Sequence, residues 1–170
     1  MNRRQTRPEI QADYGVPASQ EGMLRWAEVI TRLQAAPTYW VITIAADGSP
    51  QVTPVWGTWL GNRAYFSCGD ETHKARNLLR DPRVAIHLDS DQGVVVMHGL
   101  ARRVVDRGLE RRVTAAMRGK YGASEIPDSA ADLHGSYYEV RAHRALAWAN
   151  FPLDVTRFEF VENEAGSPDG

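Results

Sequence analysis

The feature that most constrains the fold is a series of short segments rich in β-branched and aromatic residues, each ended by residues that favour turns. The first three are TYWVITIA (38–45), QVTPVWGTWL (51–60) and RAYFSC (63–68), separated by the turns DGSP and Gly61-Asn62. Strands joined by such short turns pair antiparallel, so this stretch predicts a β-meander. Pro54 cannot donate a hydrogen bond to a neighbouring strand, which predicts that its strand lies at an edge or contains a bulge.

Further strand patterns alternate with helical ones along the rest of the chain. The strands are expected at 83–89, at 93–106 with a bulge or bend at Gly99, at 137–148 and at 155–160. Helices are expected from Gly22 to Pro37, over 73–80 after a cap at Thr72 or Asp70, and over 107–122. Six or seven strands with two or three inserted helices predict a mainly β (α+β) protein, built as a closed antiparallel barrel.

Length and composition indicate one ordinary globular domain. The 170 residues are 43% hydrophobic and 24% charged, with a net charge of -1, so no overall basic field favours nucleic acid. The longest apolar run, WVITIAA, is too short to cross a membrane, and the polar N-terminus does not resemble a secretory signal. We expect a flexible arm over 1–21, one domain over 22–161 and a disordered tail over 162–170. The lone Cys68 fits a reducing cytoplasm.

Several familiar catalytic and metal-binding patterns are missing from the sequence. The five histidines form no HxxxH pair, and the chain has no CxxC, GxSxG, dinucleotide-binding glycine motif or phosphate loop. We therefore predict no metal site. The default role of Cys68 is that of a small buried residue.

The two lysines of the chain, set against eighteen arginines, draw attention to the helix at 73–80. A helix N-terminus favours an anion, and Lys74 in that first turn opposes the helix dipole unless an anion lies between them. Ser67, Thr72, His73 and Lys74 together offer hydroxyl and cationic donors. The alternative is a capped surface helix with a solvated lysine. Lys120 lies late in its expected helix, where a cation suits the dipole without any ligand.

Four tryptophans, Trp40, Trp56, Trp59 and Trp148, lie on expected strands. Tryptophans are common in barrel cores and dimer interfaces, and either place would suit any one of them. Trp56 differs because it follows Thr53-Pro54-Val55 in an irregular strand. A bulge there would free backbone groups to face a heterocycle.

The order of these motifs resembles the pyridoxamine 5'-phosphate oxidase-like split β-barrel superfamily. The resemblance is carried by DGSPQVTPVWGTWLGNRAYFSCGDETHKARNLLRDPRVAIHLD, by HGLARRVVD and by the closing TRFEF, and it runs from about residue 38 to 160. Within this superfamily, the sequence resembles more closely the branch of flavin- and deazaflavin-dependent oxidoreductases that use coenzyme F420. The resemblance implies a six- to seven-stranded antiparallel split β-barrel with two or three peripheral helices.

The same resemblance implies a cofactor site. Thr53, Pro54, Val55 and Trp56 would line the isoalloxazine or deazaflavin ring, largely through backbone groups. Ser67, Thr72, His73 and Lys74 would bind the cofactor phosphate. His73 stands where the oxidases have arginine, and its weaker, pH-dependent contact disfavours tight FMN binding.

The function implied by the resemblance is hydride transfer between F420 and a small electron-poor acceptor, such as an enone, a quinone or a tetrapyrrole. We expect a cytoplasmic homodimer with two cofactors near its interface and with no nucleic-acid or membrane partner. No catalytic side chain is assigned, since Tyr137, Tyr138 and solvent could each supply a proton. The substrate motif of the true oxidases is not visible. An FMN oxidoreductase, a haem-binding member with His98 or His143 as ligand, and a non-enzymatic cofactor-binding or storage module remain open.

Overall fold

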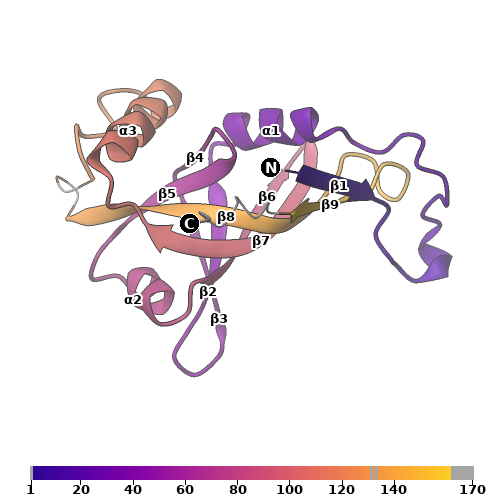
Figure 1. The fold of residues 1–170 in the computed structure, drawn as a ribbon, viewed down its shortest axis with the longest axis horizontal. Helices are drawn as coiled ribbons and strands as arrows, with labels where there is room; N and C mark the ends of the chain where they lie inside the picture. Colours follow the sequence, from indigo (N-terminus) through magenta and orange to yellow (C-terminus); the bar gives the residue numbers. More distant parts are fainter. Residues whose placement is uncertain (1, 131, 133, 162–170) are drawn as a thin grey trace, which may run out of the picture.

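An antiparallel sheet that curls into an incomplete barrel forms the frame of the protein (Figure 1). The computed structural model describes residues 2–130, 132 and 134–161, without the side chain of Asp89, so the expected tail at 162–170 lies outside the described residues. The strands are β1 (Asn2–Thr6), β2 (Tyr39–Ile44), β3 (Pro50–Val55), β4 (Gly57–Leu60), β5 (Arg63–Gly69), β6 (Arg83–Ser90), β7 (Gly93–Arg103), β8 (Gly135–Trp148) and β9 (Thr156–Val161). The helices are α1 (Trp26–Ala35), α2 (His73–Arg80) and α3 (Arg107–Tyr121), with a 3-10 turn, η1, at Ala12–Tyr14.

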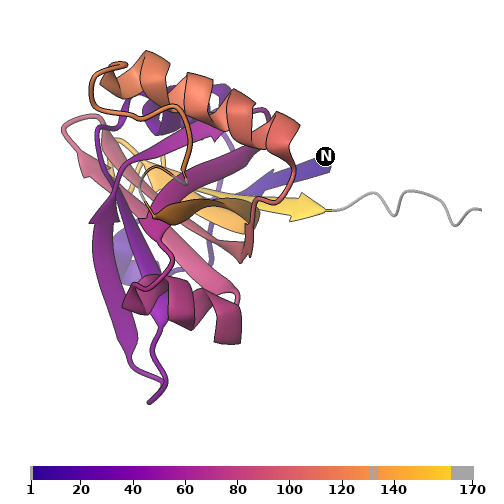
Figure 2. The same ribbon diagram turned by 90° about the vertical axis from the view of Figure 1, so that its left-hand side faces the viewer.

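The sheet runs in the order β1-β9-β8-β7-β6-β2-β3, and the β4–β5 hairpin joins it through β8. β8 pairs with β7 along one edge, and its other edge pairs with β5 through its first half and with β9 through its second half. Figure 2 shows α3 lying across one end of this frame and α2 at the other end, beside β2 and β3. The predicted mainly antiparallel fold with peripheral helices is confirmed.

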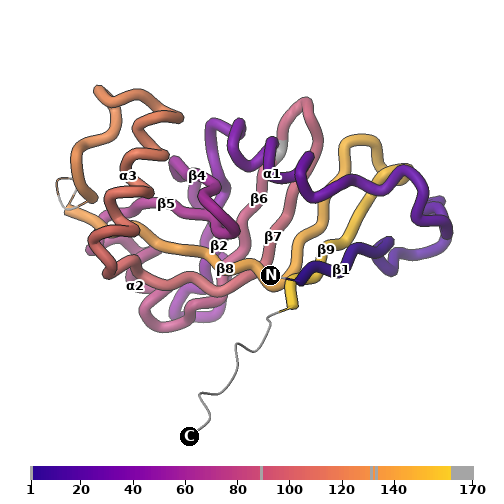
Figure 3. The backbone as a smooth tube through the Cα atoms, turned by 45° about the horizontal axis from the view of Figure 1, so that its top comes forward, coloured from indigo at the N-terminus to yellow at the C-terminus, as the bar shows by residue number. Residues whose placement is uncertain are grey.

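Two strands exceed the expected six or seven. The first is β1, which pairs with β9 from Asn2↔Val161 to Thr6↔Arg157 and lies at the end away from α2 and α3 (Figure 3). The expected flexible arm over 1–21 therefore contains a strand at its start. Its NRRQT sequence shows no apolar alternation because most of its side chains are exposed, so the strand is defined mainly by its main-chain pairing with β9.

The second additional strand arises where the expected strand 51–60 is broken at Trp56 into β3 and β4. Gly57 explains the break, because a Cβ atom there would lie 2.4 Å from a ring carbon of the fully buried Tyr39. The chain can cross this ring so closely only at glycine.

β3 is an edge strand, as Pro54 predicts. Its other neighbour in space is β5, which contacts β3 without main-chain pairing. We call this unpaired boundary between β3 and β5 the seam of the barrel. Val55 from one side and Cys68 from the other pack against the same core, so side chains close the seam although hydrogen bonds do not.

The main core fills the inside of the barrel and extends beneath α1. Its largest fully buried members include Tyr39, Phe66, Phe158, Leu33 and Ile86. A second, smaller core lies under α3, around Tyr65, Val113, Met117 and Tyr137. Burying apolar surface on both sides of β5 and β8 fixes these two strands between the cores.

Candidate functional site

Helix α2 begins with the expected cap at Thr72. The Thr72 hydroxyl accepts a hydrogen bond from the Ala75 N–H at 3.2 Å and donates one to the Gly69 carbonyl at 2.8 Å. The cap joins the end of β5 to the start of α2 and fixes the first helical turn, which holds His73 and Lys74.

Lys74 is buried, with only 7% of its surface exposed. No described residue forms a hydrogen bond or an ion pair with its ammonium group. Burial raises the pKa of the nearby Cys68 thiol, and the Lys74 charge opposes that rise. Most of the Lys74 side chain is buried and no described side chain supplies a counter-charge, so an anion bound beside its ammonium would be favourable. Lys74 therefore differs from the solvated surface lysine that the sequence left open.

A buried amide fixes α2 against the sheet. Asn77, one turn after Lys74, donates to the Thr43 hydroxyl of β2 at 3.1 Å and to the side-chain amide oxygen (Oε1) of Gln51 in β3 at 2.8 Å. These bonds set the position of Lys74 relative to the edge strand. Asn77 was not among the expected site residues, because its only local signal is a polar residue on the apolar face of a short helix.

The free edge of β3 carries backbone groups that the sheet does not use. Pro50 and Pro54 are four residues apart in β3, so their main-chain groups point to the same side of the strand, and neither residue has an N–H. Proline is accepted where the N–H would point away from the neighbouring strand, so the main-chain groups of Pro50, Val52 and Pro54 face the free edge. The Thr53 and Val55 side chains lie on the opposite face from Pro54, across from Val41 and Tyr39.

Trp56 lies between β3 and β4, and its ring stacks on Tyr121 of α3. The centroids are 5.3 Å apart with 20° between the ring planes, and 43% of Trp56 remains exposed. The structure thus places Trp56 next to the edge of β3 with one face covered by α3.

The residues expected to bind phosphate surround the start of α2 but point to different sides. Ser67 is half-buried near the end of β5, whereas Thr72 and His73 are exposed. His73 lines a cavity of about 470 Å³ beside the β2–β3 hairpin, together with Arg76 and Arg80. Thr72 lines a different cavity.

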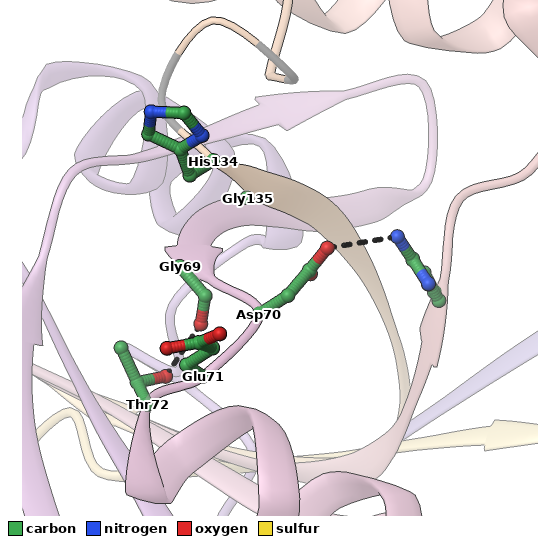
Figure 4. Close-up of a pocket in the computed structure, with 7 residues that line it drawn as sticks. Gly69, Asp70, Glu71, Thr72, His134 and Gly135 are labelled. Atoms are coloured by element: carbon green, nitrogen blue, oxygen red, sulfur yellow. Dashed lines mark hydrogen bonds and ion pairs between the residues drawn. The ribbon is translucent and has the colours of Figure 1, made fainter.

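That second cavity, of about 790 Å³, lies between the end of β5 and the start of β8 (Figure 4). One wall is an ion pair between Asp70 and Arg103 at 3.0 Å. The Ser136 hydroxyl ties the pair together, because it accepts a bond from Arg103 at 2.7 Å and donates one to Asp70 at 2.7 Å. Glu71 and His134 complete the mixed-charge lining.

A search against protein-family models matches residues 26–149 to the family described as pyridoxamine 5'-phosphate oxidase. The match covers most of the chain and includes β2 to β8 with all three α-helices. The chain belongs to the pyridoxamine 5'-phosphate oxidase family. No curated protein matches the chain.

Solved structures share the fold of this family member. A conserved hypothetical protein from Mycobacterium tuberculosis is 24% identical, covers 83% of this chain and 89% of its own, and gives a TM-score of 0.67. A haem-binding protein from Mycobacterium smegmatis is 21% identical, with 84% and 58% covered and a TM-score of 0.63. A protein described as an F420 reductase is 26% identical, with 66% and 92% covered and a TM-score of 0.54.

The pyridoxamine 5'-phosphate oxidase family implies a flavin-type cofactor with a phosphate, and Lys74 fits that group. Its ammonium is a buried cation that no described side chain neutralises, at the start of a helix that favours anions. Neither expected proton donor is presented to solvent. Tyr137 and Tyr138 are 2% and 3% exposed, and burial raises the pKa of both hydroxyls.

A bulge brings two histidines of this family member together on the outside of the sheet. The register shifts between His98 and Gly99 of β7, which leaves His143 of β8 as the extra residue. Gly99 is required there, because a Cβ atom would lie 2.3 Å from the Arg141 carbonyl oxygen. The predicted irregularity at Gly99 is therefore confirmed.

His98 and His143 both line a largely apolar cavity of about 380 Å³, next to Ile42, Ile44 and Ala85. Burial lowers the pKa of His98, and the neighbouring Arg144 and His143 lower it further. Within the described part of the chain, no group of three or more histidine, cysteine or acidic side chains could hold a metal ion. No described helix is long and apolar enough to cross a membrane.

Proposed function

We propose that the protein is an F420-dependent oxidoreductase that transfers a hydride between the deazaflavin and a small electron-poor acceptor, such as an enone, a quinone or a tetrapyrrole. The observation that carries this proposal is the buried, unneutralised Lys74. The deazaflavin supplies the hydride chemistry, and the protein holds the cofactor and excludes water. Among the described residues we assign no catalytic side chain.

The cofactor phosphate is held at the start of α2. The Lys74 ammonium provides the charge, and the hydroxyls of Ser67 and Thr72 provide neutral donors. The Thr72 hydroxyl already donates to Gly69, so it must rotate or share that proton to reach a phosphate. His73 lies in the same helical turn but lines the cavity beside the β2–β3 hairpin, so its imidazole must turn to reach the phosphate.

The cofactor ring lies along the free edge of β3. Backbone groups there are available because β3 has no strand partner at the seam. Thr53, Pro54 and Val55 form the stretch of β3 beside the ring. The main-chain groups that face it are those of Val52 and Pro54, while the exposed part of Trp56 provides an aromatic surface.

F420 is favoured over FMN because His73 replaces the arginine of the oxidase motif. The structural neighbour described as an F420 reductase agrees with this preference. The test is titration of the purified protein with each cofactor under the same buffer and salt. We expect tighter binding of F420. Tighter FMN binding, or FMN that co-purifies at full occupancy, would overturn the choice.

Enzymatic activity is tested separately from binding. Reduced F420 is incubated with the protein and a panel of enones, quinones and tetrapyrroles, and its oxidation is followed by absorbance. Cofactor oxidation that depends on both protein and acceptor supports the oxidoreductase. Tight binding without turnover across the panel would favour the cofactor-binding or storage module.

The active form is proposed to be a cytoplasmic homodimer that binds neither nucleic acid nor membranes. We expect a second copy to pack against the outside of the sheet, where neighbouring positions on β3, β2 and β6 are largely apolar. Trp40 is 41% exposed and Val52 is 56% exposed on this face. We define the outer face by Pro54, Val52, Trp40, Ile42, Ala85 and His87, which are adjacent in the strand register.

Haem binding is the second candidate, and the shared cavity of His98 and His143 favours it. The lowered pKa of His98 favours its neutral imidazole, which is the form that binds iron. The structural neighbours include proteins described as haem-binding and haem-storage proteins. The absorption spectrum with added haem separates the candidates. A Soret band that is lost in both His98→Ala and His143→Ala would support this second function.

A further inference from the structure

The second lysine, Lys120, lies in an unusual environment near the C-terminal end of α3. Its ammonium donates to the Gly57 carbonyl at 2.6 Å and, more weakly, to the Leu33 carbonyl of α1 at 3.4 Å. The same ammonium lies 4.9 Å from the centre of the Tyr39 ring and 5.1 Å from that of Tyr121. Lys120 therefore connects α1, β2, α3 and the break between β3 and β4.

Carbonyl oxygens and aromatic faces, not carboxylates, surround this cation. Within the described residues, Lys120 has no ion-pair partner, and burial lowers its pKa from 10.5 to about 8. The titratable groups that face it are the hydroxyls of Tyr39 and Tyr121. Burial raises the pKa of both, so neither changes charge near neutral pH.

Gly57 is held from two directions by consecutive residues of α3. The Tyr121 hydroxyl donates to the Gly57 carbonyl at 2.8 Å and accepts from the Gly57 N–H at 3.0 Å. Lys120 donates to the same carbonyl. Because Trp56 directly precedes Gly57 and stacks on Tyr121, these bonds set where the Trp56 ring lies.

We propose that Lys120 is a positioning residue whose ammonium, by binding the Gly57 carbonyl, holds Trp56 against the cofactor site and makes cofactor affinity depend on the charge of Lys120. The effect on affinity rests on the proposed function, whereas the effect on Trp56 does not need a cofactor. A neutral amine is a weaker donor than an ammonium group, so the contact weakens when Lys120 loses its proton.

The sign of the pH dependence follows from these contacts. Below about pH 8 the ammonium is charged and Trp56 is held, and above it the contact loosens. Arginine stays charged throughout this range, so Lys120→Arg should keep Trp56 in place at alkaline pH. Lys120→Met should resemble the neutral form at every pH.

The decisive experiment observes Trp56 in the ligand-free protein. The indole N–H signals of the five tryptophans are recorded by NMR from about pH 6.5 to about pH 9.5, which brackets the pKa of Lys120 but not that of an ordinary lysine. The Trp56 signal is assigned by its loss in Trp56→Phe, and the Trp40 signal on the outer face serves as an internal control.

We expect the Trp56 signal of the wild type to shift with a midpoint near pH 8, and the Trp40 signal to stay unchanged at this midpoint. The shift should be absent in Lys120→Arg, and in Lys120→Met the signal should stay at its alkaline position. A wild-type Trp56 signal that does not titrate, or that titrates equally in Lys120→Arg, would overturn the proposal.

The cofactor measurement is made beside this one. F420 affinity should fall about tenfold in Lys120→Met at pH 7, a typical coupling between neighbouring sites, and Lys120→Arg should restore it. Titration of the free cofactor affects all variants equally and cancels in the comparison. If Lys74→Ala binds F420 like the wild type, the proposed phosphate contact fails, while the NMR result still decides the role of Lys120.

Discussion

The Thr72 hydroxyl accepts a hydrogen bond from the Ala75 N–H at 3.2 Å, and the buried Lys74 lies between these two residues. The cap and the cation have opposite effects on the stability of α2. Thr72 stabilises the first turn of α2, whereas the Lys74 charge is unfavourable at the positive end of the same helix. This opposition allows stability and cofactor affinity to be separated by substitution.

Replacing Lys74 should weaken cofactor binding without lowering stability. Lys74→Ala removes a charge-assisted hydrogen bond worth roughly 1.5–3 kcal/mol, which is about a 10- to 150-fold loss of affinity. The free energy of unfolding should be equal to that of the wild type or higher, because a buried cation is removed from the helix N-terminus. Equilibrium titration with F420 and urea unfolding measure the two quantities.

The control for Lys74 is Arg112→Ala, which removes an exposed cation from α3 and should leave affinity unchanged. Added salt should weaken binding in the wild type more than in Lys74→Ala, because a charge contact is screened. Equal affinities for the wild type and Lys74→Ala would mean that the lysine does not contact the cofactor.

Removing the cap should have the opposite effect on stability. Thr72→Ala should lower the free energy of unfolding by about 1 kcal/mol, since the N–H of Ala75 loses its acceptor. Thr72→Ser keeps the hydroxyl and should restore most of this loss. Denaturant unfolding followed by circular dichroism gives both values, and equal stabilities for alanine and serine would contradict the capping role.

Gly57→Ala should destabilise the protein by about 1–3 kcal/mol, the usual cost of overpacking. The new Cβ atom would meet the Tyr39 ring at 2.4 Å, and this ring is fully buried with its hydroxyl bonded to the Leu33 carbonyl. Gly119→Ala is the matched control, because nothing lies within 4 Å of its Cβ position in α3. That variant should gain up to about 1 kcal/mol from helix propensity. Thermal unfolding of both proteins provides the comparison.

A charge on the outer face should disrupt the proposed dimer. Trp40→Glu places a carboxylate among the apolar residues of β2 and β3, where pairing with a second copy would bury it. We expect a dimer for the wild type and a monomer for the variant by light scattering at micromolar concentration. Val105→Glu changes a residue that is 86% exposed and away from this face, and should remain dimeric. A monomeric wild type would refute the homodimer.

The parts of the fold that sequence analysis predicted depend on local chemistry. Gly61 adopts a positive φ of 61° at the predicted hairpin turn, and Thr72 caps the predicted helix. These features follow from the conformational preferences of one or two residues. The resemblance to the family added the expectation of a split barrel, and the family match agrees with the resemblance.

The features that the sequence did not reveal depend on residues distant in the chain. The burial of Lys74 follows from how α2 packs on β2 and β5, and Asn77 bonds to Gln51 26 positions away. Lys120 bonds to the carbonyl of Gly57, which lies 63 positions earlier in the chain. The local helix pattern could therefore indicate only an ordinary cation near a helix C-terminus. The break at Trp56 likewise depends on the ring of Tyr39.

The free edge of β3 also affects which amino-acid substitutions this protein can accept. Main-chain groups are the same for nearly every amino acid, so hydrogen bonds from this edge should survive most substitutions at Val52, whose side chain is exposed. A cofactor held as we propose would leave the exposed side chains of β3 free to vary. Laboratory evolution could therefore redirect the protein to new acceptors by substitutions along β3, with the cofactor retained throughout.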